Sequence, residues 1–221
     1  MTLVESHSER YVTREPSRRL RNTRSEVRVA RTMDDLLMVY SIRSAVYIAE
    51  QDCPFAEEFD GNDHCATHFL AFTDDEPAGC LRARFFADFV KLERLAVRKP
   101  FRRSTIAFDL VRCGINHARR KGFRRIYGHA RQGVEAFWAR FGAKPMPGRD
   151  EFLFSDHYYT EMTIDLEPMD DEITLAEPAM RILRPEGDWD REGVLEFSRK
   201  RPPRSVSSNC VRATTKPTNA A

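Results

Sequence analysis

A strand, a basic loop and a helix follow one another in the middle of the sequence, in an order suited to binding a phosphorylated ligand. Val90–Val97 is a strand-like run with Leu92 and Glu93 on opposite faces, residues 98–104 hold four basic side chains, and apolar residues at helical spacing start near residue 105. A helix N-terminus directs free N–H groups and the positive end of its dipole toward the preceding loop. With Arg102 and Arg103 in that loop, we expect a pyrophosphate site.

The distribution of charge supports an anionic ligand on one side of the molecule. The net charge is only +2, yet residues 50–63 contain six acidic and no basic side chains, and residues 98–131 contain eleven basic side chains and one acid. A basic block favours either a phosphorylated cofactor or nucleic acid as partner, and a solvated basic face accounts for most of its residues. Because no nucleic-acid-binding sheet signature is present, we expect no nucleic acid partner.

Composition limits the class of protein. The chain has 221 residues, of which 41% are hydrophobic and 32% charged, as in a water-soluble globular domain with tails. No stretch approaches the ~20 apolar residues of a membrane span, and no secretory signal is visible. Five cysteines without a CxxC pair predict a reducing, cytoplasmic location. The spacing of Cys53, His64, Cys65 and His68 fits no standard zinc site, so we expect no metal.

Strands and helices are expected in the order β-α-β-β-β-α-β-α-β, which is a mixed α/β sandwich. The first helix is expected to start with a capping box, Thr32-x-x-Asp35. The expected elements are a strand at 27–29, a helix at 33–49, a hairpin of 67–73 and 79–86, a strand at 90–97, a helix at 105–120, a strand at 123–130, a helix at 134–141, and one or two strands within 151–166.

The chain is expected to divide into four parts. Residues 1–26 are predicted to form a flexible basic arm, 27–167 the α/β domain, 168–200 a C-terminal extension, and 201–221 a disordered tail. Within the extension, the pattern favours a short strand at Met180–Leu183 and a helix at Asp190–Phe197.

Two segments resemble motifs of the GNAT superfamily of N-acetyltransferases. Glu93-Arg-Leu-Ala-Val97 and the loop after it resemble the CoA-binding core, whose pattern is Arg/Gln-x-x-Gly-x-Gly/Ala. This chain reads Arg102-Arg-Ser-Thr105-Ile-Ala107, so Thr105 replaces the middle glycine. Residues 135–142 resemble the family's Phe-Tyr-x-x-x-Gly-Phe segment, with Trp138 at the Tyr position that is the general acid in many members. A packed core aromatic is the alternative for Trp138.

Upstream motifs resemble one branch of that superfamily. Residues 46–55, 58–63 and 68–71 look like the ElaA-like branch, and the whole resemblance spans about residues 27–166. A weaker resemblance concerns acyl-homoserine-lactone synthases, which share the fold. The residues at similar spacing are Arg43, Tyr47, Asp60, Asp63, Arg82 and Arg94.

The resemblance implies a GNAT-type α/β fold with a mixed, splayed central sheet flanked by helices. It implies direct transfer of an acyl group from acetyl-CoA or another acyl-CoA to an amine. The pantetheine arm would pair with the backbone of Leu95, Ala96 and Val97, and Glu93 would be the general base. The alternative for Glu93 is an ion pair with Arg82, Arg84 or Arg94, and Glu50 and Asp60 are the other candidates for the base. The residues expected to hold the pyrophosphate are Arg102, Arg103, Ser104, Thr105, Ile106 and Ala107.

The acceptor side is the less determined half of the prediction. The acidic segment 50–63 suits a cationic acceptor, either a small-molecule amine or a Lys side chain. The candidate acceptor-binding residues are Arg43, Glu50, Asp60, Asp63, Arg82 and His157. Two alternatives remain open, a synthase of acyl-homoserine lactones or N-acyl amino acids, and a non-catalytic acyl-CoA-binding module suggested by Thr105 and Trp138.

Overall fold

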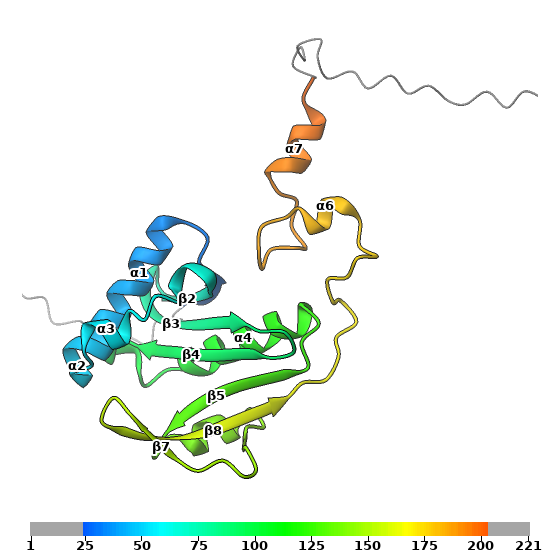
Figure 1. Cartoon of the computed structure of the whole chain (residues 1–221). Coiled ribbons are helices and arrows are strands. Elements are labelled where there is room, and N and C mark those ends of the chain that lie inside the picture. The colour runs from blue at the N-terminus through cyan, green and yellow to red at the C-terminus, as the bar shows by residue number, and fades with distance from the viewer. Residues whose placement is uncertain (1–23, 203–221) are drawn as a thin grey trace, which may run out of the picture.

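The computed structural model describes residues 24–202 (Figure 1). The predicted tails therefore lie almost wholly outside the described residues, and their properties stay predictions. The strands are β1 (Ser25–Val29), β2 (Thr67–Thr73), β3 (Glu76–Phe85), β4 (Val90–Val97), β5 (Arg125–Arg131), β6 (Lys144–Pro145), β7 (Phe152–Phe154) and β8 (His157–Asp165).

All eight strands belong to one sheet, with the order β1-β2-β3-β4-β5-β8-β6 and with β7 paired to β8. Every pair is antiparallel except β4 with β5, which is parallel. A parallel pair needs a crossover connection, and the helix between these two strands provides it. The predicted mixed α/β class is confirmed.

Helices cover both faces of the sheet. In the domain the helices are α1 (Met33–Arg43), a π-helical turn (Ser44–Ile48), α2 (Ala49–Gln51), α3 (Phe55–Glu58), α4 (Ile106–Arg120) and α5 (Glu135–Ala139). The C-terminal extension adds α6 (Ala179–Ile182) and α7 (Val194–Lys200). Two apolar clusters hold the layers together. Val39 and Ile42 of α1 pack on Leu70 at one face, and Leu110 of α4 packs with Phe69 at the other. Within residues 24–202, no helix is long and apolar enough to cross a membrane.

The expected order of elements is confirmed, with local differences that have physical causes. The strand predicted at 90–97 has those bounds, and Thr32 and Asp35 form the predicted capping box. The helix predicted at 33–49 is interrupted by the π-helical turn, whose altered hydrogen bonding is not visible in apolar spacing. The two-residue strand β6 has no sequence signal of its own, because its pairing with β8 defines it.

The C-terminal extension differs from prediction at residues 180–183, where α6 replaces the expected strand. No described strand pairs with this segment, and the carbonyl oxygens of Pro178 and Ala179 accept its N–H groups instead. The predicted helix starts later, at Val194, because Glu196 reaches back to the N–H of Gly193 at 2.7 Å. Figure 1 shows α7 standing away from the sheet.

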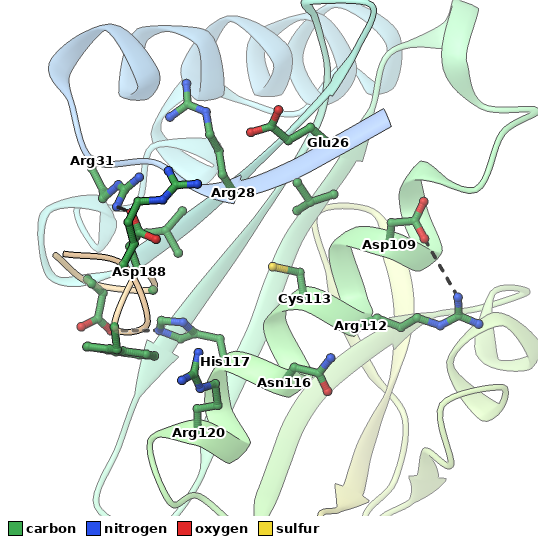
Figure 2. A pocket seen from close by; sticks show the side chains of 16 residues that line it. Glu26, Arg28, Arg31, Asp109, Arg112, Cys113, Asn116, His117, Arg120 and Asp188 are labelled. Carbon is green, nitrogen blue, oxygen red and sulfur yellow. Dashed lines mark hydrogen bonds and ion pairs between the residues drawn. The ribbon is translucent and has the colours of Figure 1, made fainter. Parts of the chain in front are cut away.

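The extension is tied to the domain beside α4. Trp189 is 5% exposed and stacks on His117 of α4 at 5.2 Å between ring centroids. Glu186 accepts from His117 at 2.9 Å, and Asp188 pairs with Arg31 at 3.1 Å. These contacts border an open groove of about 590 Å³ between β1, α4 and the extension (Figure 2). Three pairs of side chains that line the groove contact each other: Arg31 with Asp188, Arg112 with Asp109, and His117 with Glu186.

Candidate active site

Strands β4 and β5 separate beyond the point where they pair, and this opening organises the candidate site. Their register contains only Val90 opposite Ile126 and Lys91 opposite Tyr127. Figure 1 shows the two strands diverging from there toward the end of β4. The predicted splayed sheet is therefore present, and no strand among residues 24–202 pairs with that side of β4 beyond Lys91.

A bulge in β4 redirects its backbone at the opening. Cys80 of β3 lies opposite Ala96 and Arg82 opposite Glu93, so two residues of β4, Arg94 and Leu95, face one of β3. Arg94 has a φ of 55°, in the left-handed region that non-glycine residues avoid. An ion pair of 3.0 Å between Arg94 and Glu58 holds this conformation in place. Bulges of this kind bend a strand and are frequent beside functional sites.

The π-helical turn supplies a second support for the bulge. Its Tyr47 donates a hydrogen bond from the hydroxyl group to the Leu95 carbonyl oxygen at 2.8 Å. Burial raises the pKa of Tyr47, so the phenol stays protonated and able to donate. On the far side of the bulge, Nε of Arg102 donates to the Val97 carbonyl at 2.9 Å. Of the three residues predicted to pair with pantetheine, Leu95 and Val97 thus have carbonyl groups that already accept a hydrogen bond.

The basic loop places Arg102 and Arg103 before the first turn of α4, as predicted. Within the described residues, the N–H groups of Ala107 and Phe108 have no hydrogen-bond acceptor. Thr105 has a φ of −81°, a value that any residue adopts. The threonine at the family's glycine position is therefore compatible with the backbone seen here, and these free N–H groups are suited to a phosphate.

Local contacts within this loop tie down the remaining predicted side chains. Ser104 donates to the Phe101 carbonyl at 2.6 Å, and Thr105 donates to Asp109 at 2.6 Å. Arg102 pairs with Glu50 at 2.5 Å. Glu50, predicted on the acceptor side, thus lies at the loop expected to bind the donor.

Three cationic side chains surround the Glu93 carboxylate. Its carboxylate contacts Arg84 at 2.6 Å, Arg82 at 2.9 Å and Lys91 at 3.1 Å, and its side chain is 9% exposed. Burial alone would raise the pKa of Glu93, but the charges of Arg82 and Lys91 and the hydrogen bond from Arg84 bring that pKa below its usual value. This geometry favours the ion-pair alternative, with Lys91 in place of Arg94, over the role of general base, because three cations already occupy the carboxylate oxygens.

Most of the predicted acceptor-binding residues form a buried ion-pair cluster under α1 and α3. Arg43 is fully buried and contacts Glu58 and Asp63 at 2.5 Å each. Arg82 is also fully buried, and it makes two hydrogen bonds to Asp60, at 2.8 and 2.6 Å. The cluster comprises Arg43, Glu58, Asp60, Asp63, Arg82, Arg84, Lys91, Glu93 and Arg94.

The structure thus gathers the residues that resemble the lactone synthases, but as internal partners. Burial would raise the pKa of Asp60, yet hydrogen bonds from Arg82 and from the Asn62 backbone hold it well below the usual range. Because every carboxylate of the cluster has an Arg partner, residues 57–63 present little free negative charge. The cluster thus leaves fewer free carboxylates for a cationic acceptor than the sequence suggested, and the nature of the acceptor stays a prediction.

Across the opening, β5 and β8 present three linked polar side chains that the sequence did not single out. The Tyr127 hydroxyl donates to Glu161, and Nε2 of His129 lies 2.7 Å from the same hydroxyl oxygen. We call these three residues the His129 relay. Tyr127 and His129 are two apart on β5, and His129 is the register partner of Glu161. Period-two spacing places Tyr127 and His129 on one face, whereas the link to Glu161 depends on a strand pairing that sequence does not reveal.

The hydrogen bonds of the relay fix the protonation of His129. Because Tyr127 gives its single proton to Glu161, its oxygen must accept from Nε2 of His129, and Nδ1 then has a free lone pair. Nδ1 has no partner among the described residues and is not closed off from solvent. Burial, and then the charge of Lys91, lower the pKa of His129 to about 4, so the imidazole is neutral near pH 7.

The other two predicted residues lie apart from the relay. Trp138 of α5 packs on Phe137 at 5.4 Å and Phe141 at 6.4 Å, and it also packs against the core shared with α4. These contacts favour the packed-aromatic alternative for Trp138. His157 begins β8 on the same face as Glu161, four residues away, and it is half-buried.

The comparisons with known proteins agree with this fold. A sequence profile described as "Acetyltransferase (GNAT) family" matches residues 36–143. YyaT of Bacillus subtilis is 30% identical over 114 residues, covering 50% of this chain and 77% of that protein. Escherichia coli ElaA superposes with a TM-score of 0.57 at 19% identity, over 64% of this chain and 99% of ElaA.

A second solved structure concerns the synthase alternative. FeeM, an N-acyl amino acid synthase from uncultured soil microbes, superposes with a TM-score of 0.56 at 11% identity, over 65% of this chain and 91% of FeeM. At this identity the likeness shows the fold alone, whereas the profile and the relatives share sequence with this chain. The chain belongs to the GNAT family of acetyltransferases, enzymes whose acyl donor is an acyl-CoA.

Proposed function

We propose that the protein is an acyl-CoA-dependent N-acyltransferase in which the donor lies along β4 and the acceptor amine approaches from the His129 relay. The observation that supports this most directly is the separation of β4 from β5. It leaves a bulged backbone and a helix N-terminus on one side, and a neutral imidazole on the other.

On the donor side, the residues fit a CoA pyrophosphate. Arg102 and Arg103 and the free N–H groups of Ala107 and Phe108 provide positive charge and donors at the N-terminus of α4. Arg102 has to leave Glu50 to reach a phosphate. Such an exposed pair is worth only about 0–1 kcal/mol, so this exchange costs little.

On the acceptor side, His129 is placed to take the proton of the attacking amine. The amine nitrogen attacks the thioester carbonyl carbon, a C–N bond forms, the C–S bond breaks, and the amine proton passes to Nδ1 of His129. The negative charge of Glu161, linked through Tyr127, favours the imidazolium that results, whereas burial and the charge of Lys91 oppose it. A thiol has a pKa near 8.5, so the departing thiolate takes its proton from water without an acidic side chain at Trp138.

The test of the proposal measures donor binding and turnover in one preparation. We expect acetyl-CoA to bind in calorimetry and a mixture of amines to release free CoA thiol. Changing both Arg102 and Arg103 to Gln removes two charge-assisted contacts and is expected to weaken CoA binding by about 2–4 kcal/mol. Arg112→Gln is the matched control, because Arg112 lies on α4 and is 68% exposed. Unchanged affinity in the double variant contradicts the donor site.

Chain length of the acyl group distinguishes the remaining alternatives. An acetyltransferase uses acetyl-CoA in preference to decanoyl-CoA, and a synthase of the acyl-homoserine-lactone kind shows the reverse order. Binding of CoA without thiol release, for any amine tested, favours the binding-module alternative.

A further inference from the structure

An exposed arginine follows His129 on the acceptor face of the sheet. Arg131 ends β5 two residues beyond His129, so both side chains lie on the same face. It makes no ion pair with any described residue, and its nearest polar contact is Gln51 at 3.5 Å. In contrast, Arg82 and Arg94 on the neighbouring strands are committed to carboxylates.

A tyrosine hydroxyl accompanies this arginine. Tyr159 of β8 is the register partner of Arg131, and its ring centroid lies 6.0 Å from that of Phe152 and 6.0 Å from that of Phe154. Its hydroxyl makes no hydrogen bond to a described residue. Burial raises the pKa of Tyr159, so the phenol keeps its proton near neutral pH. An unpaired arginine and a protonated tyrosine together suit a carboxylate.

Contacts between segments distant in the sequence limit the size of an acceptor that can reach Arg131 and Tyr159. Ser155, in the turn between β7 and β8, donates to Glu57 of α3, and its hydroxyl lies 3.6 Å from the sulfur of Cys53. The turn of the β7–β8 hairpin is thereby held against α3 beside the open end of the sheet, an arrangement that favours a small acceptor over a protein surface.

We infer that the acceptor is a small α-amino acid, whose carboxylate binds Arg131 and Tyr159 while its amine faces Nδ1 of His129. The inference rests on the proposed function. The Cα atoms of residues two apart on one face of a strand lie about 6.6 Å apart, so His129 and Arg131 are close enough to contact the two ends of one small molecule. The reaction is the one already written, and the product is an N-acyl amino acid that keeps its carboxylate.

Paired acceptors test this inference. Thiol release from acetyl-CoA and from decanoyl-CoA is measured with L-leucine, L-phenylalanine, L-glutamate and L-lysine, each beside its α-amide, and with spermidine and a lysine-containing peptide. We expect kcat/KM for the preferred amino acid to exceed that for its amide by about 10- to 100-fold, since the amide loses a charge-assisted contact.

Two variants locate the effect. Arg131→Gln is expected to raise KM for the amino acid at least ~10-fold, to leave the amide unchanged and to change kcat less than ~3-fold. Arg125→Gln, at the other end of β5 where Arg125 is 58% exposed, is the control and leaves both KM values unchanged. Tyr159→Phe is expected to raise KM for the amino acid less than Arg131→Gln does.

The outcomes separate the inference from the proposed function. Equal use of amino acids and amides, preferential use of spermidine or the peptide, or an equal loss for acid and amide in Arg131→Gln overturns the inference and leaves the N-acyltransferase intact. Failure of every acceptor to release thiol overturns the proposed function, and the inference with it.

Discussion

Two polar groups lie on the same face of the sheet, on either side of the opening, and they differ in how completely they are paired. In the buried ion-pair cluster on β3 and β4, Arg43 and Arg82 are wholly buried and every carboxylate has at least one arginine partner. In the His129 relay on β5 and β8, one imidazole nitrogen keeps a free lone pair, and the neighbouring Arg131 has no ion-pair partner among residues 24–202.

Charge density alone therefore does not mark a reactive site. The cluster contains the residues that resemble a family's substrate-binding set, yet its charges satisfy one another and hold α1, α3 and the β4 bulge together. The relay has fewer charges, but its atoms have unused bonding capacity. Function is expected where that capacity remains.

The largest effect is expected from His129→Gln. This change removes the proton acceptor while keeping a side chain of similar size, and general bases typically contribute about 10²–10⁴-fold to rate. We expect kcat to fall within that range, with CoA binding unchanged in calorimetry and the thermal midpoint nearly unchanged.

Glu93→Gln is the contrasting variant, because it replaces the residue first predicted as the base. If the relay acts as proposed, Glu93→Gln lowers kcat less than about 10-fold, well below the contribution of a general base. A loss in Glu93→Gln that exceeds the loss in His129→Gln would return the role of base to Glu93.

The next largest effect is expected on the free energy of unfolding, when a residue of the buried ion-pair cluster is replaced. Arg43→Met leaves Glu58 and Asp63 short of a partner in a region without solvent, and breaking a buried pair typically costs about 3–5 kcal/mol. We expect the free energy of unfolding in urea to fall by that amount. Arg112→Met, at an exposed position, is expected to change it by less than ~0.5 kcal/mol. Similar values for the two variants would mean that the cluster is not structural.

The sequence predicted the donor half of the molecule far better than the acceptor half. The strand 90–97, the basic loop and α4 are consecutive, so their arrangement follows from local patterns and from the crossover between parallel strands. The pairing of Glu50 with Arg102 joins residues 52 positions apart, and no local pattern reports it.

The relay and the bulge could not be predicted for a related reason. His129 and Glu161 meet because β5 and β8 pair in one particular register, and a shift of one residue would send Glu161 to the other face. The conformation of Arg94 depends on Glu58 from α3, which lies 36 residues earlier. Both features depend on tertiary contacts that periodicity does not encode.

A smaller effect links the two groups through Lys91, which pairs with Glu93 and also lies near His129. Burial is the first cause of the low pKa of His129, and the charge of Lys91 is the second, opposed by Glu161 and Glu93. We expect nuclear magnetic resonance to find that His129 titrates at about pH 4, and that Lys91→Gln raises this pKa. No change in the variant would show that the two groups are electrostatically independent.

The same shift has a consequence for stability. The pKa of His129 is about 4 when folded and 6.5 as the reference for an unfolded chain, so the unfolded state binds more protons between these values. The contribution of His129 therefore lowers the free energy of unfolding as the pH falls from about 6.5 to 4, and it has no effect above 6.5. In Lys91→Gln this fall is expected to be smaller.

The smallest effect on catalysis is expected from Trp138→Phe. Trp138 contacts Phe137 and Phe141 and belongs to the core shared with α4, on the face of the sheet opposite the relay. Indole does not titrate in a useful range, and solvent can protonate a thiolate whose conjugate acid has a pKa near 8.5, so no proton transfer depends on this side chain. We therefore expect kcat to stay within about threefold of the wild type, since losses of ~10²-fold or more are typical only of acid–base groups.

The smaller ring leaves a partial cavity, and the free energy of unfolding is expected to fall by about 1–2 kcal/mol, less than the ~3–5 kcal/mol of a complete truncation. Loss of activity in Trp138→Phe, with folding and CoA binding intact, would show that the indole acts at the reacting sulfur and that the division between a catalytic face and a packing face is wrong.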